Sequence, residues 1–547
     1  MSRVPARWSV LWRKLGRRAP WTAACILASW LPARSAAAQV LRDSSTSWLA
    51  SVGSEGERYL RTLQVAALAP PAHWSLRPFS GHELRRLLPA DSGHPWARQF
   101  AVPPRRQVWV RFIQPELTGI YNSGFPYGMH DGPVWAGRGP TITALAGMEG
   151  AVGPLEFTVA PQLFRAENWS FAIAPNGMTG PQAFGDALRP DRIDLPQRFG
   201  DGPYQRFDPG QSTVRLRLLG TMVGVSTANE AWGPATDSPF LLGSNAAGFP
   251  HFFVGTDGSL ALGPLRTSVR LIAGRLDQSP YAPSSLSSRR YLTGAIVVLG
   301  VRQVPGLEVG LARLFHNATP DTGVSVSDIL TQLLKNPFKA RLSAQLGADG
   351  TEPDNQLAAA FMRWNVPGAG LELYGELGRE DNAYDLRDFL VEPDRDVSYS
   401  LGMQRVWRRS DGSLFALRGE ILSSAASHLA RARQPEPPYV HTPITQGHTQ
   451  LGQVLGAPGG YGGGAGMVAV EWVTTTGRRT ITWRRVLAEP VMLPAPRNVV
   501  HAVTFDWLLF RPRIDLSPEA TLAYGLNRVA VGDALNLRAA LTGRMHW

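Results

Sequence analysis

The sequence contains no long apolar run, one cysteine and almost no lysine. A membrane-spanning helix needs about 20 apolar residues, and the run from Trp21 to Leu31 is far shorter. The single cysteine, Cys25, lies in that run, and Thr22 stands where a lipoprotein signal normally has leucine. We therefore expect neither a helical membrane span nor lipid attachment, and no disulfide, thiolate metal site or cysteine nucleophile.

Motifs for cofactors and catalysis are also missing. The 11 histidines show no HExxH or other paired spacing, and the chain has no nucleotide-binding loop, dinucleotide fingerprint or nucleophile elbow. We expect no metal, no cofactor and no enzymatic activity.

The basic residues do not form the pattern of a nucleic-acid-binding protein. Seven of the 55 lie in residues 1–38, which hold no acid, so the remainder carries a net charge of +5. They are spread among acids, without a long basic tract. Arginine outnumbers lysine by 52 to 3. This excess suits bidentate binding of acidic sugars or lipid phosphates, although a GC-rich coding bias is the favoured explanation.

The amino terminus has the pattern of a secretory signal. A basic segment (Arg3, Arg7, Arg13, Lys14, Arg17 and Arg18) precedes the apolar run, and the small residues Ala36-Ala37-Ala38 follow it. This order predicts a signal peptide over residues 1–38, cleaved after Ala38.

The carboxyl terminus alternates with a period of two. Leu537, Leu541, Met545 and the terminal Trp547 share one parity, while polar residues including Arg538 occupy the other. A strand with one apolar and one polar face that ends on an aromatic residue is typical of the closing strand of an outer-membrane β-barrel. We therefore expect an all-β, antiparallel barrel whose outer face meets lipid.

Further strand-like segments fill residues 105–547, the predicted barrel domain. At about 9 to 11 residues per strand plus loops, this length has room for about 16 to 18 strands. The expected strands are 107–114, two within 141–163, 213–225, 267–276, 292–302, 307–315, 356–365, 371–379, 398–407, 413–421, 467–474, 479–486, 501–511, 519–527 and the terminal strand.

Two kinds of segment interrupt this series. Short helices are expected at Ser327 to Leu334, capped by Ser327, and at Asp385 to Leu390. Residues 174–210 and 424–465 are rich in Pro, Gly and Gln, and we expect external or lumen-filling loops there. A plugged or constricted pore follows from such loops.

Residues 39–104 have a helical pattern instead. Ser54 with Glu57, and Ser80 with Glu83, have the spacing of capping boxes and precede leucines at helical intervals. We expect a small periplasmic helical segment attached to the barrel.

Three blocks of sequence resemble the Wzi capsule-assembly family of outer-membrane proteins. The first runs from Tyr121 to Gly128 and continues through Asp131-Gly132, Trp135 and Gly137-Arg138-Gly139. The second comprises Tyr374-Gly375-Glu376, Gly378 to Asp381, Asp385 to Asp388 and Glu392-Pro393, and the third Gln446-Gly447-His448 with Gly452 to Gly456. The blocks occur in the family's order. The glycine-rich run 459–466 and the proline-rich loop around 434–438 depart from the family's pattern.

The resemblance implies a monomeric barrel with a small helical bundle on the periplasmic side. It implies that the chain binds capsular or exopolysaccharide like a lectin and assists capsule attachment at the outer membrane, with outer-membrane lipid around it. The identity of the glycan is not implied.

Acidic residues near Tyr374 raise the question of a glycosidase. Glu372, Tyr374, Glu376 and Glu380 share the predicted luminal parity, and Leu371, Leu373 and Leu377 the lipid-facing one. Glu372 and Glu376 would lie roughly 13 Å apart, beyond the approximately 5 to 9.5 Å that glycosidase geometries need. Salt bridges to luminal arginines such as Arg363 are the favoured interpretation, although Glu376 paired with an acid from a neighbouring strand stays possible.

The candidate ligand-binding residues lie in the three blocks. An aromatic ring with nearby amide, carboxylate and guanidinium groups suits sugar recognition, although glycine-rich loops also fold inward to stabilise a barrel. Trp407, Trp472, Trp483, Trp507 and Tyr524 are assigned to the interfacial girdles instead. The candidates are Asn122, Asp131, Trp135, Arg138, Glu376 and Arg379. Asp385, Arg387, Asp388, Gln446, His448 and Gln453 have less weight, and a ligand role for them is what the family resemblance implies.

The sequence thus predicts a barrel that is exported to the outer membrane and binds surface polysaccharide non-covalently. Two alternatives from other classes stay open: a diffusion porin, and, with less support, an outer-membrane enzyme that modifies glycans.

Overall fold

The computed structural model describes most of the chain after the predicted leader, and residues 1–38 lie outside the described part. The described residues are 39–41, 51–88, 93–97, 99, 107–285, 288–320, 323–334, 354–380, 386–391, 393, 397–424, 437–440, 444–487, 498–528 and 531–546.

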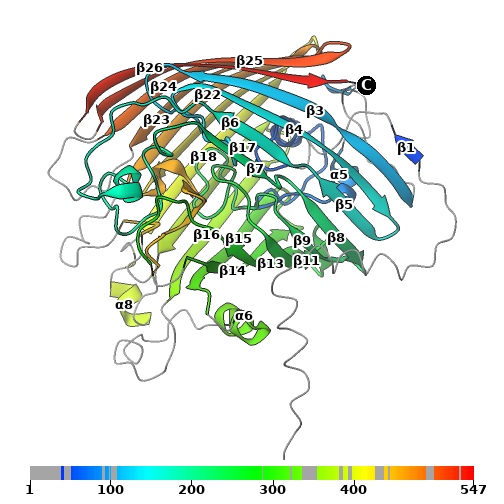
Figure 1. Ribbon diagram of the computed structural model, residues 1–547. Helices are drawn as coiled ribbons and strands as arrows, with labels where there is room; N and C mark the ends of the chain where they lie inside the picture. Colours follow the sequence, from blue (N-terminus) through cyan, green and yellow to red (C-terminus); the bar gives the residue numbers. More distant parts are fainter. Residues whose placement is uncertain are drawn as a thin grey trace, which may run out of the picture. The chain divides into compact units, whose positions relative to one another are not determined.

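The described residues form a closed antiparallel barrel of 18 strands (Figure 1). Strand β26 pairs with β3, from Arg538 opposite Asn122 to Arg544 opposite Glu116, which closes the sheet. The strands are β3 (Val108–Asn122), β4 (Gly139–Val152), β5 (Leu155–Val159) continued by β6 (Gln162–Ala166), β7 (Tyr204–Asp208) continued by β8 (Thr213–Leu218), β9 (Thr221–Ser226), β11 (His251–Thr256) continued by β12 (Leu260–Leu262), β13 (Leu265–Leu276), β14 (Arg290–Val301), β15 (Leu307–Ala318), β16 (Asp354–Val366), β17 (Leu371–Glu380), β18 (Val397–Arg408), β19 (Leu414–Ser423), β22 (Gly464–Thr474), β23 (Gly477–Leu487), β24 (Val499–Leu509), β25 (Ile514–Arg528) and β26 (Gly532–Met545).

Side chains alternate between the lumen and the outer face, as the sequence predicted. In β17, Glu372 and Glu376 are 0% and 2% exposed, whereas Leu373 and Leu377 are 42% and 58% exposed. Exposed leucines on a closed sheet need a hydrocarbon environment. The fold prediction is therefore confirmed. No helix among the described residues is long and apolar enough to cross a membrane.

Aromatic side chains gather on the outer face near the strand ends. Trp407, Trp472 and Tyr524 are about 40% exposed, and Trp407 and Trp472 both contact Phe415, with ring centroids 5.4 and 5.2 Å apart. These positions agree with the predicted interfacial girdles.

The two ends of the barrel differ in the length of their connections. One end has only short turns, such as 153–154, 219–220 and 475–476. The other end carries the connections 123–138, 167–203, 227–250, 277–289, 319–353, 381–396, 424–463 and 488–498. We refer to these as the short-turn end and the long-loop end.

Several strand predictions were wrong or incomplete. Residues 213–225, predicted as one strand, form the hairpin β8–β9, whose turn residues Leu219 and Gly220 have φ of 50° and 79°. A leucine gives no turn signal in sequence, although the two positive φ angles suit a tight hairpin. Strands β7 and β11 were not predicted, because β7 lies within a segment expected to be a loop.

The remaining elements are short. They are β1 (Gln39–Leu41), α4 (Glu55–Val65), β2 (Leu76–Arg77), α5 (Gly81–Leu87), η1 (Gly180–Phe184), β10 (Ala231–Trp232), α6 (Val326–Leu333), α8 (Leu386–Val391), β20 (Thr449–Gln450), β21 (Gln453–Val454) and η3 (Pro458–Gly460). The N-caps Ser54 and Ser80 of α4 and α5 are confirmed. Helix α6 spans Val326–Leu333, whereas residues 327–334 with Ser327 as the cap were predicted; Ser325 caps it instead.

Candidate functional site

Segments from both ends meet inside the lumen. Strand β10, in the 227–250 connection, enters from the long-loop end and pairs with β2 of the amino-terminal segment. Trp232, Phe240 and Tyr439 are at most 1% exposed and form a core with inward-facing residues of the wall. The described part of 424–465, expected to be an external or a lumen-filling loop, thus reaches the lumen, and so do residues 227–250, for which no such role was predicted.

Carboxylates of the barrel wall hold the inserted loop by its backbone. Glu376 accepts hydrogen bonds from the amides of Ala235 (2.8 Å) and Phe240 (3.2 Å). Glu420 accepts from the amides of Thr236, Asp237 and Ser238 at 2.9, 3.1 and 2.5 Å. The free-energy cost of burying a carboxylate is offset when several backbone amides donate hydrogen bonds to it. Both acids therefore have an evident structural role in fixing the loop.

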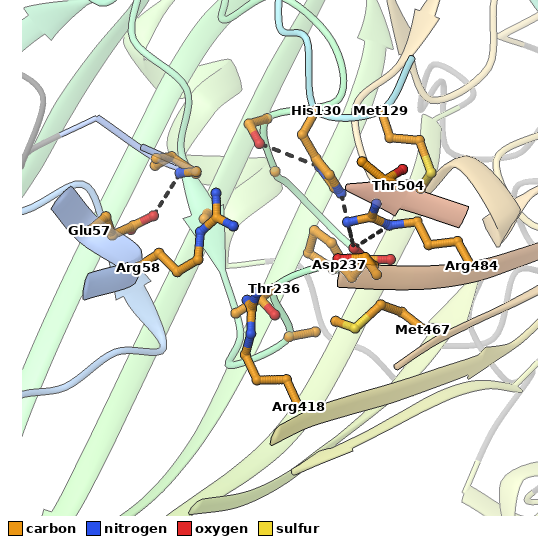
Figure 2. A pocket seen from close by; sticks show the side chains of 18 of the residues that line it. Glu57, Arg58, Met129, His130, Thr236, Asp237, Arg418, Met467, Arg484 and Thr504 are labelled. Carbon is orange, nitrogen blue, oxygen red and sulfur yellow. Dashed lines mark hydrogen bonds and ion pairs between the residues drawn. The ribbon is translucent and has the colours of Figure 1, made fainter. Parts of the chain in front are cut away.

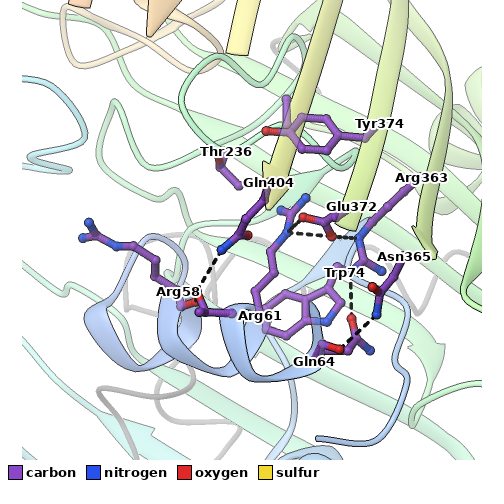
Figure 3. Close-up of polar contacts among 12 residues, drawn as sticks. Arg58, Arg61, Gln64, Trp74, Thr236, Arg363, Asn365, Glu372, Tyr374 and Gln404 are labelled. Carbon is purple, nitrogen blue, oxygen red and sulfur yellow. Dashed lines mark hydrogen bonds and ion pairs between the residues drawn. The ribbon is translucent and has the colours of Figure 1, made fainter. Parts of the chain in front are cut away.

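Helix α4 is joined to the wall by a buried charge network (Figure 3). Glu372 binds Arg61 of α4, 3.0 Å away, and Arg363 of β16. Arg363 also binds Glu308 and donates to Gln64 of α4 at 2.6 Å. The predicted pairing of Glu372 with Arg363 is confirmed. The packing of α4 inside the barrel was not predicted.

A cavity of about 270 Å³ lies between the segments inside the lumen and one side of the barrel wall (Figure 2). Charged side chains from α4, the loops and strands β19 to β26 line it, including Arg58, Arg418 and Arg484. A second cavity of about 440 Å³ shares Arg58, His130 and Asp131 with it. Charged and polar side chains make up much of the lining of both cavities, which suits water.

A third cavity, of about 170 Å³, lies between the loops of the long-loop end. We call it the outer cavity. Its lining combines the indole of Trp135, the amides of Asn245 and Gln453, the phenol of Tyr127 and the carboxylate of Asp131; His130, Val134, Leu195 and Pro196 are among the other lining residues. An aromatic face beside amide and carboxylate groups can pack on the C–H face of a sugar and fix its hydroxyls.

Charges at the base of the outer cavity are set by burial and ion pairs. Burial raises the pKa of Asp131 to about 6, although Arg538, 3.4 Å away, opposes the shift. Burial also lowers the pKa of His130, despite the nearby Asp237. For Asp237 burial acts to raise the pKa, but Arg484, 2.8 Å away, together with other cationic neighbours outweighs this effect and lowers it. At neutral pH the cavity therefore presents a carboxylate and a neutral imidazole.

Trp135 and Asp131 are the predicted residues that the structure brings together in this cavity, with Gln453. The Trp135 ring packs on Phe199, with centroids 4.7 Å apart, and its Nε1 donates to Asn168 at 3.4 Å. The ring is thus held in place and is half-buried.

Asn122 and Arg138 instead stabilise the loop that carries Trp135. Asn122 is fully buried and donates to the carbonyl oxygens of Tyr127 and Ala136. Arg138 donates to the carbonyl oxygens of Ser123 (3.0 Å) and Ser170 (2.7 Å). Their predicted contact with a ligand stays a prediction.

Gln446 and His448 are buried beneath the loops. Gln446 donates to Gln278 at 2.8 Å and to Ser285 at 2.7 Å. His448 lies 2.8 Å from His316 and 2.6 Å from the carbonyl oxygen of Leu241. Both are 1% exposed or less, so they support the inserted loops in this structure.

Burial lowers the pKa of His448 to about 4. A histidine in the unfolded chain titrates near pH 6.5. Between about pH 4 and 6.5, His448 is therefore protonated in the unfolded chain but neutral in the folded chain. Stability is therefore full above about pH 6.5 and falls as the pH drops towards 4. We expect a loss of about 2 kcal/mol between pH 6.5 and 5. Urea unfolding of the native chain and of His448→Asn across this range would check it. An unchanged pH slope in the variant would contradict it.

The second block contributes nothing to the outer cavity among the described residues. Arg379 has the outward parity of β17, and Arg387 is exposed on α8. Asp388 lies in α8, and Asp385 lies outside the described residues. Sequence reasoning also missed His130 and Asn245, which carry no motif and reach the cavity only because their loops fold inward.

Structure comparison relates the barrel to Wzi, an outer-membrane protein involved in group 1 capsule assembly in Escherichia coli and described as a carbohydrate-binding β-barrel. The match covers 90% of this chain and 98% of Wzi, with a TM-score of 0.62 and 13% identity. This chain has the fold of Wzi. The resemblance predicted from the three sequence blocks is therefore confirmed at the level of the fold.

Other matches are more distant. OccK3 and OprD of Pseudomonas aeruginosa each give a TM-score of 0.38, with 10% and 11% identity. They cover 80% and 79% of this chain, and the matches span 96% and 92% of their own lengths. No protein-family model matches the sequence, and no curated protein does.

Proposed function

We propose that this chain is an outer-membrane barrel that binds surface polysaccharide non-covalently at the outer cavity and so assists the attachment or assembly of a capsule. Export by the predicted signal peptide would bring it to the outer membrane. The short turns would face the periplasm and the long loops the exterior, as in other barrels of this class. We expect it to act as a monomer.

One observation carries the proposal: a half-buried indole, Trp135, lines the outer cavity together with Asn245 and Gln453 at the long-loop end. The carbohydrate-binding Wzi, whose fold the chain shares, supports it. Asp131 is the charged residue among the described lining residues of the outer cavity, which include neither arginine nor lysine. Stacking and amide hydrogen bonds would therefore dominate, and a neutral glycan would suit the site better than an acidic one.

The two alternatives have less support. A diffusion porin needs an open lumen, whereas β2, β10 and the core around Trp232 occupy this one. A glycosidase needs two free carboxylates, whereas Glu376 binds two backbone amides and Glu372 binds two arginines. We therefore propose no catalytic residues and no cofactor.

Replacing Trp135 with alanine tests the proposal. Loss of an aromatic stacking contact of about 0.5–1.5 kcal/mol would weaken glycan binding by up to about ten-fold. Binding of purified, heat-modifiable protein to the polysaccharide extracted from the source cells would be measured by calorimetry. Weak affinity for each sugar would be amplified by repeated polymer units, so short oligosaccharides should be used as well.

Trp169→Ala is the matched control. Trp169 is 47% exposed, at the same end of the barrel, and packs against Tyr121 rather than lining the outer cavity. We expect native affinity in this control. Equal affinity of Trp135→Ala and the native chain would remove the outer cavity as the binding site.

A further inference from the structure

Two strands of the wall are covered on their outer face at the long-loop end. In β14 and β15 the odd-numbered residues face outward: Val297 and Leu311 are 37% and 67% exposed. Yet Tyr291 and Phe315, which have the same parity nearer the long-loop end, are 8% and 1% exposed. Protein therefore covers this part of the outer wall, just beyond the apolar residues that face lipid.

Helix α6 lies at this place. It contacts β14, and Gln332 of α6 donates to the side chain of Asn317 at 3.3 Å. Asn317 has the outward parity of β15 and is 1% exposed. The helix thus packs against the outside of the barrel rather than inside it; Figure 1 shows it beside β14.

The helix has three faces with different chemistry. Gln332 contacts the barrel, and Ile329 and Leu333 near it are half-buried. Val326, Leu330 and Leu334 follow one another at intervals of four and share the adjoining face. They are 73%, 51% and 81% exposed. Ser327, Asp328 and Thr331 occupy the third face.

We propose that α6 lies in the surface of the outer leaflet, with Val326, Leu330 and Leu334 among the lipid acyl chains. A helix with one apolar and one polar face rests at the headgroup boundary, its apolar face about 5–10 Å deep. Continuity argues for lipid as the occupant: α6 covers the long-loop end of the same strands whose outer face, further along at Val297 and Leu311, is apolar and exposed. Its polar face, with Asp328 and Thr331, points to water.

The helix would then fix the depth of this side of the barrel and anchor the connection between β15 and β16 at the membrane surface. This role is independent of glycan binding at the outer cavity, because no α6 residue lines that cavity.

Single-cysteine labelling tests the proposal. Cys25 is the only cysteine in the sequence, so Leu330→Cys in a Cys25→Ser background gives one labelled position. Thr331→Cys is the matched control, one residue away on the polar face. Each variant would carry an environment-sensitive fluorophore in vesicles of phosphatidylethanolamine and phosphatidylglycerol, with and without nitroxide on the acyl chains.

At position 330 we expect a blue-shifted emission and loss of most of the fluorescence to the acyl-chain nitroxide. At position 331 we expect water-like emission with little quenching. Both sites are on the surface, so the variants should fold, and heat-modifiability would verify this. Water-like, unquenched emission at 330 would overturn the proposal, as would a shielded label at 330 that the nitroxide does not reach, since that result would indicate a protein partner.

Discussion

Replacing Arg363 with methionine is expected to lower the free energy of unfolding by about 3–5 kcal/mol, the usual effect of removing one member of a buried charge pair. Arg363 is 1% exposed and joins Glu308, Glu372 and Gln64. Methionine nearly preserves the volume, so the loss would come from the buried carboxylate of Glu308, which loses its counter-charge, and from that of Glu372, which keeps only Arg61. Urea unfolding in detergent micelles, followed by tryptophan fluorescence, would measure it.

Two further variants separate charge from packing. Arg275→Met removes an exposed arginine, 58% accessible, whose partner is Asp277, and exposed pairs contribute little; we expect no measurable change. Adding Glu308→Gln to Arg363→Met should restore part of the stability, because the carboxylate left without a counter-charge disappears, whereas Glu372 stays paired with Arg61. Wild-type stability of Arg363→Met alone would contradict the buried network.

Replacing Glu420 with alanine is expected to release the inserted loop from the wall. Glu420 accepts bonds from three consecutive amides, those of Thr236, Asp237 and Ser238, and from the hydroxyl of Tyr374 at 2.6 Å. Each buried donor left without a partner costs about 1–3 kcal/mol. Even partial loss would speed amide exchange in residues 233–242 on the order of a hundred-fold. Hydrogen exchange followed by mass spectrometry would measure it.

Glu420→Gln provides the control for this prediction. The amide keeps a carbonyl acceptor in the same place, so exchange of the loop should rise far less than in the alanine variant. Exchange at the 51–65 segment should change little, since α4 is joined to the wall by Arg61 and Gln64 rather than by Glu420. Identical protection of residues 233–242 in Glu420→Ala and the native chain would show that the carboxylate does not hold the loop.

The alternation of side chains made the barrel predictable from the sequence. Leu373 and Leu377 against Glu372 and Glu376 identify both faces of a strand, because a period of two needs only local information. The caps Ser54 and Ser80 were equally local. The turn at Leu219 was not, since its left-handed conformation is imposed by the hairpin.

The candidate site was only partly predictable. Trp135 and Asp131 were identified within a sequence block, whereas Asn245 belongs to a loop that reaches them only after folding into the lumen. The residue types of a ligand site are present at Glu376, Gln446 and His448. Each of these side chains is buried, however, and forms hydrogen bonds with backbone or side-chain groups of the loops inside the barrel. A sequence lists polar residues but not which of them the loops themselves will use.

The most direct test of the central claim is the retention of polysaccharide by cells. A strain without this chain would be complemented with the native protein, Trp135→Ala or Trp169→Ala, and surface-bound and shed polysaccharide would be quantified. We predict shedding in the deletion strain and with Trp135→Ala, and retention with the native chain and Trp169→Ala. Unchanged retention after deletion, or full restoration by Trp135→Ala, would contradict a glycan-binding role of the outer cavity.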